Sequence, residues 1–333
     1  MKTRTLGKTL KVSAIGLGCM GFTHAYGPPM DESKAATAIC RAFDLGYTFF
    51  DTAECYIGQR PDRTTTWNEA VVGLALKGKR DRVQIATKCG VRHENRLLVM
   101  DSRPETIRRS VEGSLQRLGT DYIDLYYQHR IDPKVPPEEV AGVMADLIRQ
   151  GKILYWGISE TDESYLRRAY AVCPVTAIQN RYSMMARWHE ALFPVLEELS
   201  IGFVAFSPLA NGLLSGAYGR GDSFAPGDYR SAMPQFSPEA YEANRALRQL
   251  VEGTAKNYNA TPAQLSMAWM LAKKPYIVPI PGSRRPDRMA ENVCAAEVTL
   301  TQEEVNALDT ALAQAEMSAV FGGSPARKQD GNP

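Results

Sequence analysis

Four polar side chains in this sequence have types that together suit the reduction of a carbonyl group by hydride. They are Asp51 and Tyr56 in Asp51-Thr52-Ala53-Glu54-Cys55-Tyr56, Lys88 in Ala86-Thr87-Lys88, and His129 in Tyr126-Tyr127-Gln128-His129. Hydride addition leaves negative charge on the carbonyl oxygen, and an unperturbed tyrosine, with a pKa of about 10, donates a proton poorly near neutrality. A nearby Lys88 ammonium is expected to lower the pKa of Tyr56, and Asp51 to keep Lys88 charged. His129 is then placed to hydrogen-bond the carbonyl oxygen and stabilise its developing charge.

Taken singly, each of these residues has an ordinary structural explanation. A tyrosine after a strand is usually a packed aromatic ring, and a lysine is usually a solvated surface charge. Their common position favours the catalytic interpretation, because each follows a predicted strand. In a barrel of parallel strands, the residues at successive strand ends converge on one face.

The elements that must position these residues alternate between short apolar strands and amphipathic helices. That alternation is typical of repeated βα units and a parallel sheet. The sequence therefore predicts an α/β fold, a (β/α)8 TIM barrel with an N-terminal hairpin cap and long loops at the C-terminal face. The predicted strands are Ala14–Leu17, Thr48–Asp51, Val83–Thr87, Ile123–Gln128, Leu154–Ile158, Ala177–Gln179, Phe203–Phe206 and Ile277–Val278.

Two of the intervening helices have clear sequence boundaries. Ser102 and Glu105 predict a capping box, and Gly119 ends the apolar stripe that follows it. The next helix is predicted to begin at Pro136-Pro137 and to stop at Gly151. Such helices are expected to cover the outside of the barrel.

One barrel domain is expected to span residues 1–333, a length that such barrels commonly reach. Residues 1–12 read as a hairpin that turns at Gly7-Lys8 and caps one end of the barrel. Residues 207–239, rich in Gly, Pro, Ser and Ala, are expected to form a long cofactor-covering loop. A terminal helix over residues 301–315 precedes a tail, residues 316–333, whose Val320-Phe321 could fold over a pocket.

Composition argues against several classes of protein. The 39 basic and 37 acidic side chains give a net charge of only +2 and are spread along the chain, so a nucleic-acid-binding face is not expected. No apolar run approaches the length of a membrane span, and the N-terminus lacks a signal-peptide core. The six cysteines lie far apart without a Cys-x-x-Cys pair, which favours free thiols in a reducing cytoplasm over a metal site or disulfides.

Two apparent nucleotide motifs fail in their context. Residues 16–21 match Gly-x-Gly-x-x-Gly after a predicted strand, but Gly27-Pro28-Pro29 precede the next helix, so no helix opens onto a pyrophosphate. Gly7-Lys8-Thr9 lacks the upstream glycine of a P-loop. A better phosphate site is predicted after the last strand, where Arg284, Arg285 and Arg288 precede and begin a helix.

Together these segments resemble the aldo-keto reductase superfamily over nearly the whole chain. The resemblance is carried by Gly16-Leu17-Gly18, the stretches around Asp51, Lys88 and His129, Gly157-Ile158-Ser159, Ala177-Ile178-Gln179-Asn180, Phe206-Ser207-Pro208-Leu209, Ile280-Pro281-Gly282-Ser283 and Glu291-Asn292. It implies an (β/α)8 barrel that binds NADPH or NADP in an extended conformation and reduces aldehydes or ketones to alcohols.

The resemblance also implies roles for individual residues. Tyr56 would be the general acid, tuned by Lys88 and Asp51, and His129 would position the carbonyl. Ser159 and Gln179 would hydrogen-bond the nicotinamide carboxamide, and Phe206 would stack on its ring. The remaining cofactor-binding residues implied are Met20, Ser207, Leu209, Gly212, Leu213, Gly282, Ser283, Arg284, Arg288, Glu291 and Asn292.

Two other functions remain open from the sequence. The chain could be an NADPH-binding regulatory or redox-sensing subunit with little turnover, or a barrel hydrolase or isomerase that uses Asp51 and Glu54 as paired carboxylates. The identity of the carbonyl substrate is set by loops near Phe22, His24, Trp67, Tyr229 and Phe321 and is not predicted. The preferred direction of reaction and the oligomeric state also stay open.

Overall fold

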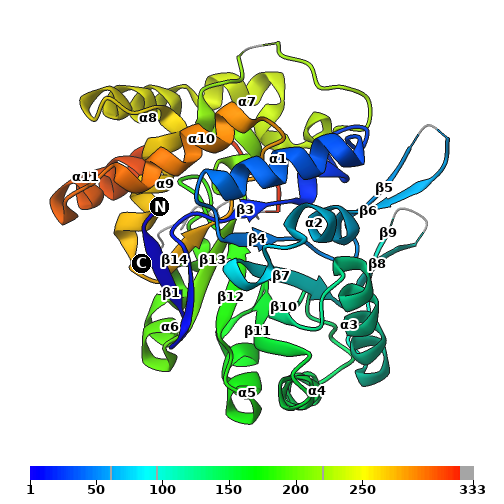
Figure 1. Ribbon diagram of the computed structural model, residues 1–333. Coiled ribbons are helices and arrows are strands. Elements are labelled where there is room, and N and C mark those ends of the chain that lie inside the picture. The colour runs from blue at the N-terminus through cyan, green and yellow to red at the C-terminus, as the bar shows by residue number, and fades with distance from the viewer. Residues whose placement is uncertain (61, 95–96, 220, 323–333) are drawn as a thin grey trace.

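The computed structural model describes residues 1–60, 62–94, 97–219 and 221–322 (Figure 1). Its centre is an eight-stranded parallel sheet with the order β14-β13-β12-β11-β10-β7-β4-β3. The strands are β3 (Leu17–Gly18), β4 (Phe49–Asp51), β7 (Gln84–Cys89), β10 (Ile123–Gln128), β11 (Ile153–Ser159), β12 (Ala177–Arg181), β13 (Gly202–Phe206) and β14 (Ile277–Pro279). The predicted (β/α)8 barrel is confirmed, although the first strand lies at Leu17–Gly18 rather than Ala14–Leu17.

The barrel closes where the first and last strands meet. Gly18 forms a parallel bridge with Gly282, and the Gly18 amide donates to the Pro281 carbonyl at 3.2 Å. A Cβ atom on Gly18 would lie 2.8 Å from the Ile280 carbonyl oxygen, so a side chain there would force the two strands apart. Gly18, the second glycine of the apparent dinucleotide motif, therefore serves barrel closure.

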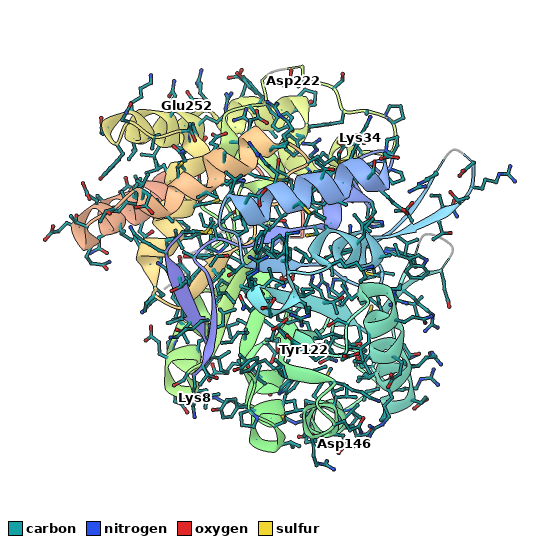
Figure 2. The ribbon with its side chains drawn as sticks, viewed as in Figure 1. Lys8, Lys34, Tyr122, Asp146, Asp222 and Glu252 are labelled. Carbon is teal, nitrogen blue, oxygen red and sulfur yellow. The ribbon has the colours of Figure 1, made fainter. Side chains whose placement is uncertain are left out.

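Helices surround the sheet (Figure 1). Charged side chains such as Lys34, Asp146 and Glu252 project from this outer layer in Figure 2. The helices are α1 (Glu32–Asp44), α2 (Asn68–Leu76), α3 (Pro104–Leu118), α4 (Pro137–Arg149), α5 (Glu163–Val172), α6 (Phe193–Leu199), α7 (Pro238–Ala243), α8 (Arg245–Asn257), α9 (Pro262–Lys273), α10 (Pro286–Cys294) and α11 (Gln302–Gln314). None of the helices in the described part of the chain is long and apolar enough to cross a membrane.

The expected helix boundaries are met with one exception. α3 ends at Gly119 with a left-handed φ of 65°, and α4 begins directly after Pro136, as predicted. The capping box at Ser102 is wrong, because the N-cap residue of α3 is Arg103 and makes no side-chain cap. The Ser102 hydroxyl instead accepts a hydrogen bond from Gln128 at 2.9 Å, which ties the start of α3 to the end of β10.

An N-terminal hairpin, β1 (Thr3–Leu6) with β2 (Leu10–Ser13), packs onto the inside of the barrel, and Lys8 lies at its turn (Figure 2). Leu6, Leu10 and Val12 are buried in one cluster with inward-facing strand residues such as Tyr127. A Cβ on Gly202 of β13 would meet the Leu6 side chain at 2.5 Å, so the hairpin contacts the strand start directly. The predicted cap at this end of the barrel is confirmed.

At the opposite end, the loops carry more structure than the sequence indicated. Two antiparallel hairpins, β5 (Ile57–Gln59) with β6 (Thr65–Trp67) and β8 (Val91–Glu94) with β9 (Leu97–Met100), extend from the barrel. The long loop after β13 contains three short 3-10 helices, Ala210–Ser215, Tyr229–Ala232 and Pro234–Phe236. The tail is described only to residue 322, and the remainder of the predicted segment 316–333 lies outside the described residues.

Candidate active site

The strand ends bring the four candidate catalytic residues to one face of the barrel. Asp51 is the last residue of β4, Lys88 lies near the end of neighbouring β7, and His129 directly follows β10. Parallel pairing places Lys88 opposite Tyr127, two residues before His129. The ring of Tyr56 reaches the same place, with its centroid 5.8 Å from that of His129 and 5.1 Å from Lys88 Nζ.

Lys88 and Asp51 form a buried ion pair. Lys88 Nζ lies 2.5 Å from Asp51 Oδ1 and donates to the Thr52 carbonyl at 2.7 Å, and the lysine side chain is 1% exposed. Gln179 of β12 donates to the other Asp51 oxygen at 2.7 Å. Burial raises the pKa of Asp51, while Lys88 and the Gln179 amide oppose that rise. The carboxylate therefore orients the ammonium beneath the tyrosine ring.

Tyr56 differs from the sequence expectation in its protonation. Burial first, and then the negative charge of Asp51, raise the pKa of Tyr56 well above its usual value of 10. The net shift is thus opposite to the predicted lowering, and the Lys88 ammonium, which faces the ring, also donates to Asp51 and Thr52. The phenol is consequently held as a neutral proton donor.

His129 is a neutral imidazole in this environment. Burial lowers its pKa well below 6.5, and the neighbouring positive charges of Arg130 and Lys88 act in the same direction. Its Nδ1 lies 3.4 Å from the Cys55 sulfur. Burial raises the pKa of Cys55 to about 12, so this thiol stays protonated beside the site.

Three residues that the resemblance assigns to the nicotinamide lie around this centre. Gln179 is already engaged by Asp51, and the Ser159 hydroxyl, at the end of β11, accepts from Arg130 at 3.0 Å. Phe206 ends β13, and its ring centroid lies within 5.9 Å of the Arg130 guanidinium carbon and 4.9 Å of that of Arg181. The three strand ends thus place these side chains next to the catalytic residues.

The chain after Phe206 turns sharply. Ser207, Ala210, Asn211 and Gly212 all have positive φ, with 109° at Gly212. The Ala210 and Gly212 amides donate to the Ser207 and Leu209 carbonyls at 3.0 and 2.8 Å, so the turn is held by its own backbone hydrogen bonds. Ser207, Leu209, Gly212 and Leu213, expected near a pyrophosphate, all lie on this turn.

The predicted adenosine-phosphate site lies at the barrel closure, after β14. Arg284 Nε donates to the Gly21 carbonyl, while Arg284 Nη2 is buried without a hydrogen-bond partner among the described residues. Glu291 Oε1 is also buried and unpartnered within the described chain, and its other oxygen pairs with Arg288 at 2.5 Å.

The other residues expected at this end lie close by. The N-cap residue of α10, Arg285, makes no side-chain cap, and the acidic Asp287 lies in the first turn of that helix. Met20 begins a short 3-10 helix beside Gly18, Ser283 precedes the arginines, and Asn292 is buried on α10. The buried Arg284 Nη2 can donate to a phosphate, and the buried Glu291 Oε1 can accept from an amino or hydroxyl group of an adenosine.

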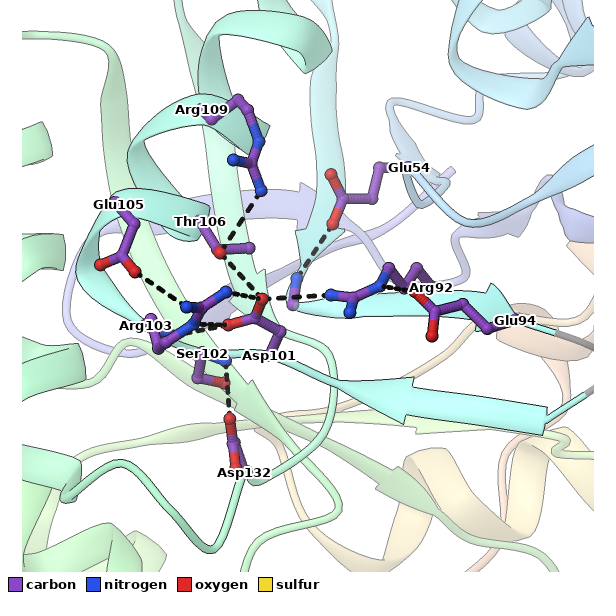
Figure 3. Close-up of polar contacts among 11 residues, drawn as sticks. Glu54, Arg92, Glu94, Asp101, Ser102, Arg103, Glu105, Thr106, Arg109 and Asp132 are labelled. Carbon is purple, nitrogen blue, oxygen red and sulfur yellow. Dashed lines mark hydrogen bonds and ion pairs between the residues drawn. The ribbon is translucent and has the colours of Figure 1, made fainter.

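The hairpin β8–β9 was not predicted, and it brings an additional histidine to the site. His93 lies with its ring 5.3 Å from that of His24, which in turn stacks on Tyr56 at 6.0 Å. Asp101 anchors the base of this hairpin by accepting from Arg92, Arg103 and Thr106 at 3.1, 2.8 and 3.0 Å (Figure 3).

Arg130 and Arg181 are two further residues that the sequence interpretation missed. Arg130 follows His129 directly, so a search of the residues flanking each predicted strand end would have found it. Arg181, two residues beyond Gln179 on the same strand face, could have been found from the alternation of side chains along a strand.

The closed parallel barrel carries these side chains at its strand ends, and comparison with known proteins identifies the class to which it belongs. The family model described as "Aldo/keto reductase family" matches residues 14–313. Probable aldo-keto reductase 1 of Glycine max is 39% identical over 298 residues, which cover 89% of this chain and 84% of that protein. Aldo-keto reductase str7 of Strobilurus tenacellus is 37% identical over 317 residues, covering 92% and 91%.

Solved structures show the same relationship. The glycerol dehydrogenase of Gluconobacter oxydans has a TM-score of 0.83 at 28% identity, covering 97% of this chain and 99% of its own. An aldo/keto reductase from Klebsiella pneumoniae, in complex with NADP and acetate, has a TM-score of 0.68 at 27% identity, covering 93% and 95%. The chain belongs to the aldo/keto reductase family, and its class of activity is oxidoreduction of carbonyl compounds.

Proposed function

We propose that this protein reduces aldehydes or ketones to alcohols with NADPH, using Tyr56 as the general acid. The observation that carries this proposal is the convergence of four side chains from three neighbouring strand ends. Lys88 Nζ, 2.5 Å from Asp51 Oδ1, faces the Tyr56 ring at 5.1 Å, and His129 lies against the same ring.

When bound, NADPH supplies the hydride that reduces the carbonyl carbon. In the proposed mechanism, His129 and Tyr56 hydrogen-bond the carbonyl oxygen and orient it. As negative charge grows on that oxygen, the Tyr56 phenol transfers its proton to it. Lys88, held charged by Asp51, then stabilises the phenolate that remains.

The raised pKa of Tyr56 is compatible with this role. An alkoxide is a stronger base than a phenolate, so proton transfer from the phenol to the reduced oxygen is favourable even without acidification. The neutral state of His129 also suits the scheme, because a neutral imidazole can donate one hydrogen bond without competing for the transferred proton.

NADPH is proposed over NADH because positively charged arginines lie where the first and last strands of the barrel meet. Arg284 has a buried, unpartnered Nη2, and Arg288 lies one turn into α10. Guanidinium groups bind phosphate through paired hydrogen bonds, which suits the 2′-phosphate that distinguishes NADPH. The Klebsiella pneumoniae relative, whose structure contains NADP, supports this choice.

The test is a spectrophotometric assay of NADPH oxidation with a panel of aromatic aldehydes, aliphatic aldehydes and dicarbonyls. Tyr56→Phe should lower kcat by about 10²–10⁴-fold, the usual contribution of a positioned general acid. NADPH affinity, followed by fluorescence quenching, should stay unchanged because the ring is retained. No oxidation with any substrate would contradict the reductase proposal, and unchanged kcat in the variant would contradict the role of Tyr56.

A further inference from the structure

Two arginines beside the proposed reaction centre have no carboxylate partner among the described residues. Arg130 donates to the His129 carbonyl at 2.6 Å and to the Ser159 hydroxyl at 3.0 Å. Arg181 is 6% exposed, and its described side-chain hydrogen bond is a long one to Asn211 Oδ1 at 3.4 Å. Burying a guanidinium with so few strong acceptors is costly unless a ligand supplies them.

Three other partly buried arginines in this protein are paired with carboxylates. Arg80 lies 2.6 Å from Asp124, Arg117 lies 2.6 Å from Glu69, and Arg230 lies 2.6 Å from Asp228. Within the described chain, Arg4 has no carboxylate partner and donates instead to three backbone carbonyls. Arg181 has neither kind of partner set among the described residues, since its described side-chain hydrogen bond is the long one to Asn211.

Two carboxylates in this part of the site have other partners, although the negative charge of Glu160 still acts on Arg181. Glu160 Oε1 accepts from the backbone amide of Arg181 at 2.8 Å, and both oxygens of Asp51 are used by Lys88 and Gln179. The two guanidinium groups lie against the same ring, Phe206, at 5.9 and 4.9 Å from its centroid. Together they form a positive pair that flanks one aromatic surface.

Their position separates them from the predicted adenosine-phosphate site, although Arg181 bonds to Asn211 on the turn expected near the pyrophosphate. Arg130 follows β10 and Arg181 ends β12, whereas Arg284 and the N-terminus of α10 follow β14 at the barrel closure. Arg130 is also adjacent in sequence to His129, which faces Tyr56. An anion between the two arginines would thus lie on the side of the site where a carbonyl is reduced.

We propose that the carbonyl substrate carries a carboxylate that binds between Arg130 and Arg181, while its aldehyde or ketone oxygen lies at Tyr56 and His129. This inference rests on the proposed reductase function and narrows its substrate class to oxo acids. Carboxylate and guanidinium match in geometry and charge, so the pair of arginines selects such a group by charge-assisted hydrogen bonds.

The wild-type enzyme tests the inference with matched substrates. NADPH oxidation is measured with 4-carboxybenzaldehyde and with its methyl ester, and again with 4-oxobutanoate and its methyl ester. Each pair has the same reacting carbonyl and differs in one negative charge. We expect kcat/KM for the acid to exceed that for the ester by about ten-fold or more, the usual effect of a hydrogen-bonded charge. If both members of a pair are reduced and kcat/KM for the ester equals or exceeds that for the acid, the inference is wrong. The reductase proposal then still stands. Absence of turnover with every carbonyl overturns both.

Two variants of Arg181 and one control test whether the preference for the acid over the ester depends on this arginine. Arg181→Met should lower the acid-to-ester ratio of kcat/KM about ten-fold. Arg181→Lys keeps the positive charge but not the planar guanidinium, so it should retain part of that ratio. Arg109→Met removes one positive charge from the outer face of α3 and should leave the ratio unchanged. If Arg181→Met weakens NADPH binding and leaves the acid-to-ester ratio as in wild type, the arginine binds cofactor, and the inference is wrong. A thermal melt of each variant shows that the compared proteins are folded.

Discussion

At the residue scale, the site depends on how a buried lysine is kept charged. Lys88 is 1% exposed, and a buried ammonium without a partner would lose its proton. Asp51 at 2.5 Å and the Thr52 carbonyl supply the compensation, and Gln179 completes the hydrogen bonding of Asp51. The positive charge is thus available beneath Tyr56, where a phenolate would form.

The buried histidine of the site gives a pH dependence with a definite sign. The pKa of His129 in the folded protein lies well below 6.5, whereas an unfolded histidine titrates near 6.5. Below that pH the unfolded chain binds more protons than the folded one, so stability falls as pH decreases. The loss begins near pH 6.5 and continues down toward the folded pKa.

The variant His129→Gln removes this titration, so comparing it with the wild type isolates the contribution of His129. Between pH 7.5 and 5.5, the unfolding free energy of the wild type should fall by about 1 kcal/mol more than that of the variant. Urea unfolding at both pH values measures the difference, and the other histidines, which are present in both proteins, cancel. Parallel pH dependence in the two proteins would mean that His129 is not buried in its neutral form.

At the element scale, close approach between helices explains the glycine at position 73 but not the glycine at position 142. α2 packs on α3, and a Cβ on Gly73 of α2 would lie 2.3 Å from the Leu118 carbonyl oxygen. Gly142 of α4 has no atom within 4 Å of the corresponding position. Close packing therefore requires a glycine at position 73, whereas position 142 has room for a side chain.

These two glycines form a matched pair of substitutions. Gly73→Ala should lower the unfolding free energy by about 1–3 kcal/mol, because the helices must separate to admit a methyl group. Gly142→Ala should raise it by about 0.5–1 kcal/mol, since alanine favours a helix interior. Both values come from denaturant melts of the purified variants. Equal effects of the two substitutions would show that α2 and α3 are further apart than described.

Loops at the open end of the barrel are also structured elements. Asp101 fixes the base of the hairpin β8–β9 by accepting hydrogen bonds from Arg103, Thr106 and Arg92 (Figure 3). These contacts, with Arg103 first, keep the pKa of Asp101 low. This anchor places His93 near His24 and hence near Tyr56. The hairpin that brings His93 toward the site is therefore anchored to the barrel at Asp101.

At the scale of the whole molecule, barrel closure joins the two ends of the sheet and forms the proposed cofactor end of the site. Arg284, after the last strand, donates to the Gly21 carbonyl, which follows the first strand. The same residue carries the unpartnered Nη2. Barrel closure and the proposed preference for NADPH are thus linked through the Arg284 side chain.

Replacing Arg284 and Arg288 together by alanine should raise KM for NADPH about ten-fold or more and change KM for NADH much less. The reason is that only NADPH carries the phosphate that these guanidiniums are proposed to bind. Steady-state kinetics with both cofactors and one aldehyde measure the effect, and Arg285→Ala, whose side chain pairs with Asp287, is the control. Equal increases for both cofactors would place the two arginines elsewhere in the site.

The sequence by itself determined the barrel, the strand ends that carry Asp51, Lys88 and His129, and the N-terminal hairpin. These features depend on local patterns, namely apolar runs, helix stops such as Gly119, and side chains that follow a strand. Only the tertiary structure decided what surrounds those residues. The raised pKa of Tyr56, the engagement of Gln179 by Asp51, the use of Gly18 for closure, and the lack of a carboxylate partner for Arg130 and Arg181 among the described residues all arise between segments distant in sequence. Burial and the charges of neighbouring strands set these properties, and no local pattern encodes them.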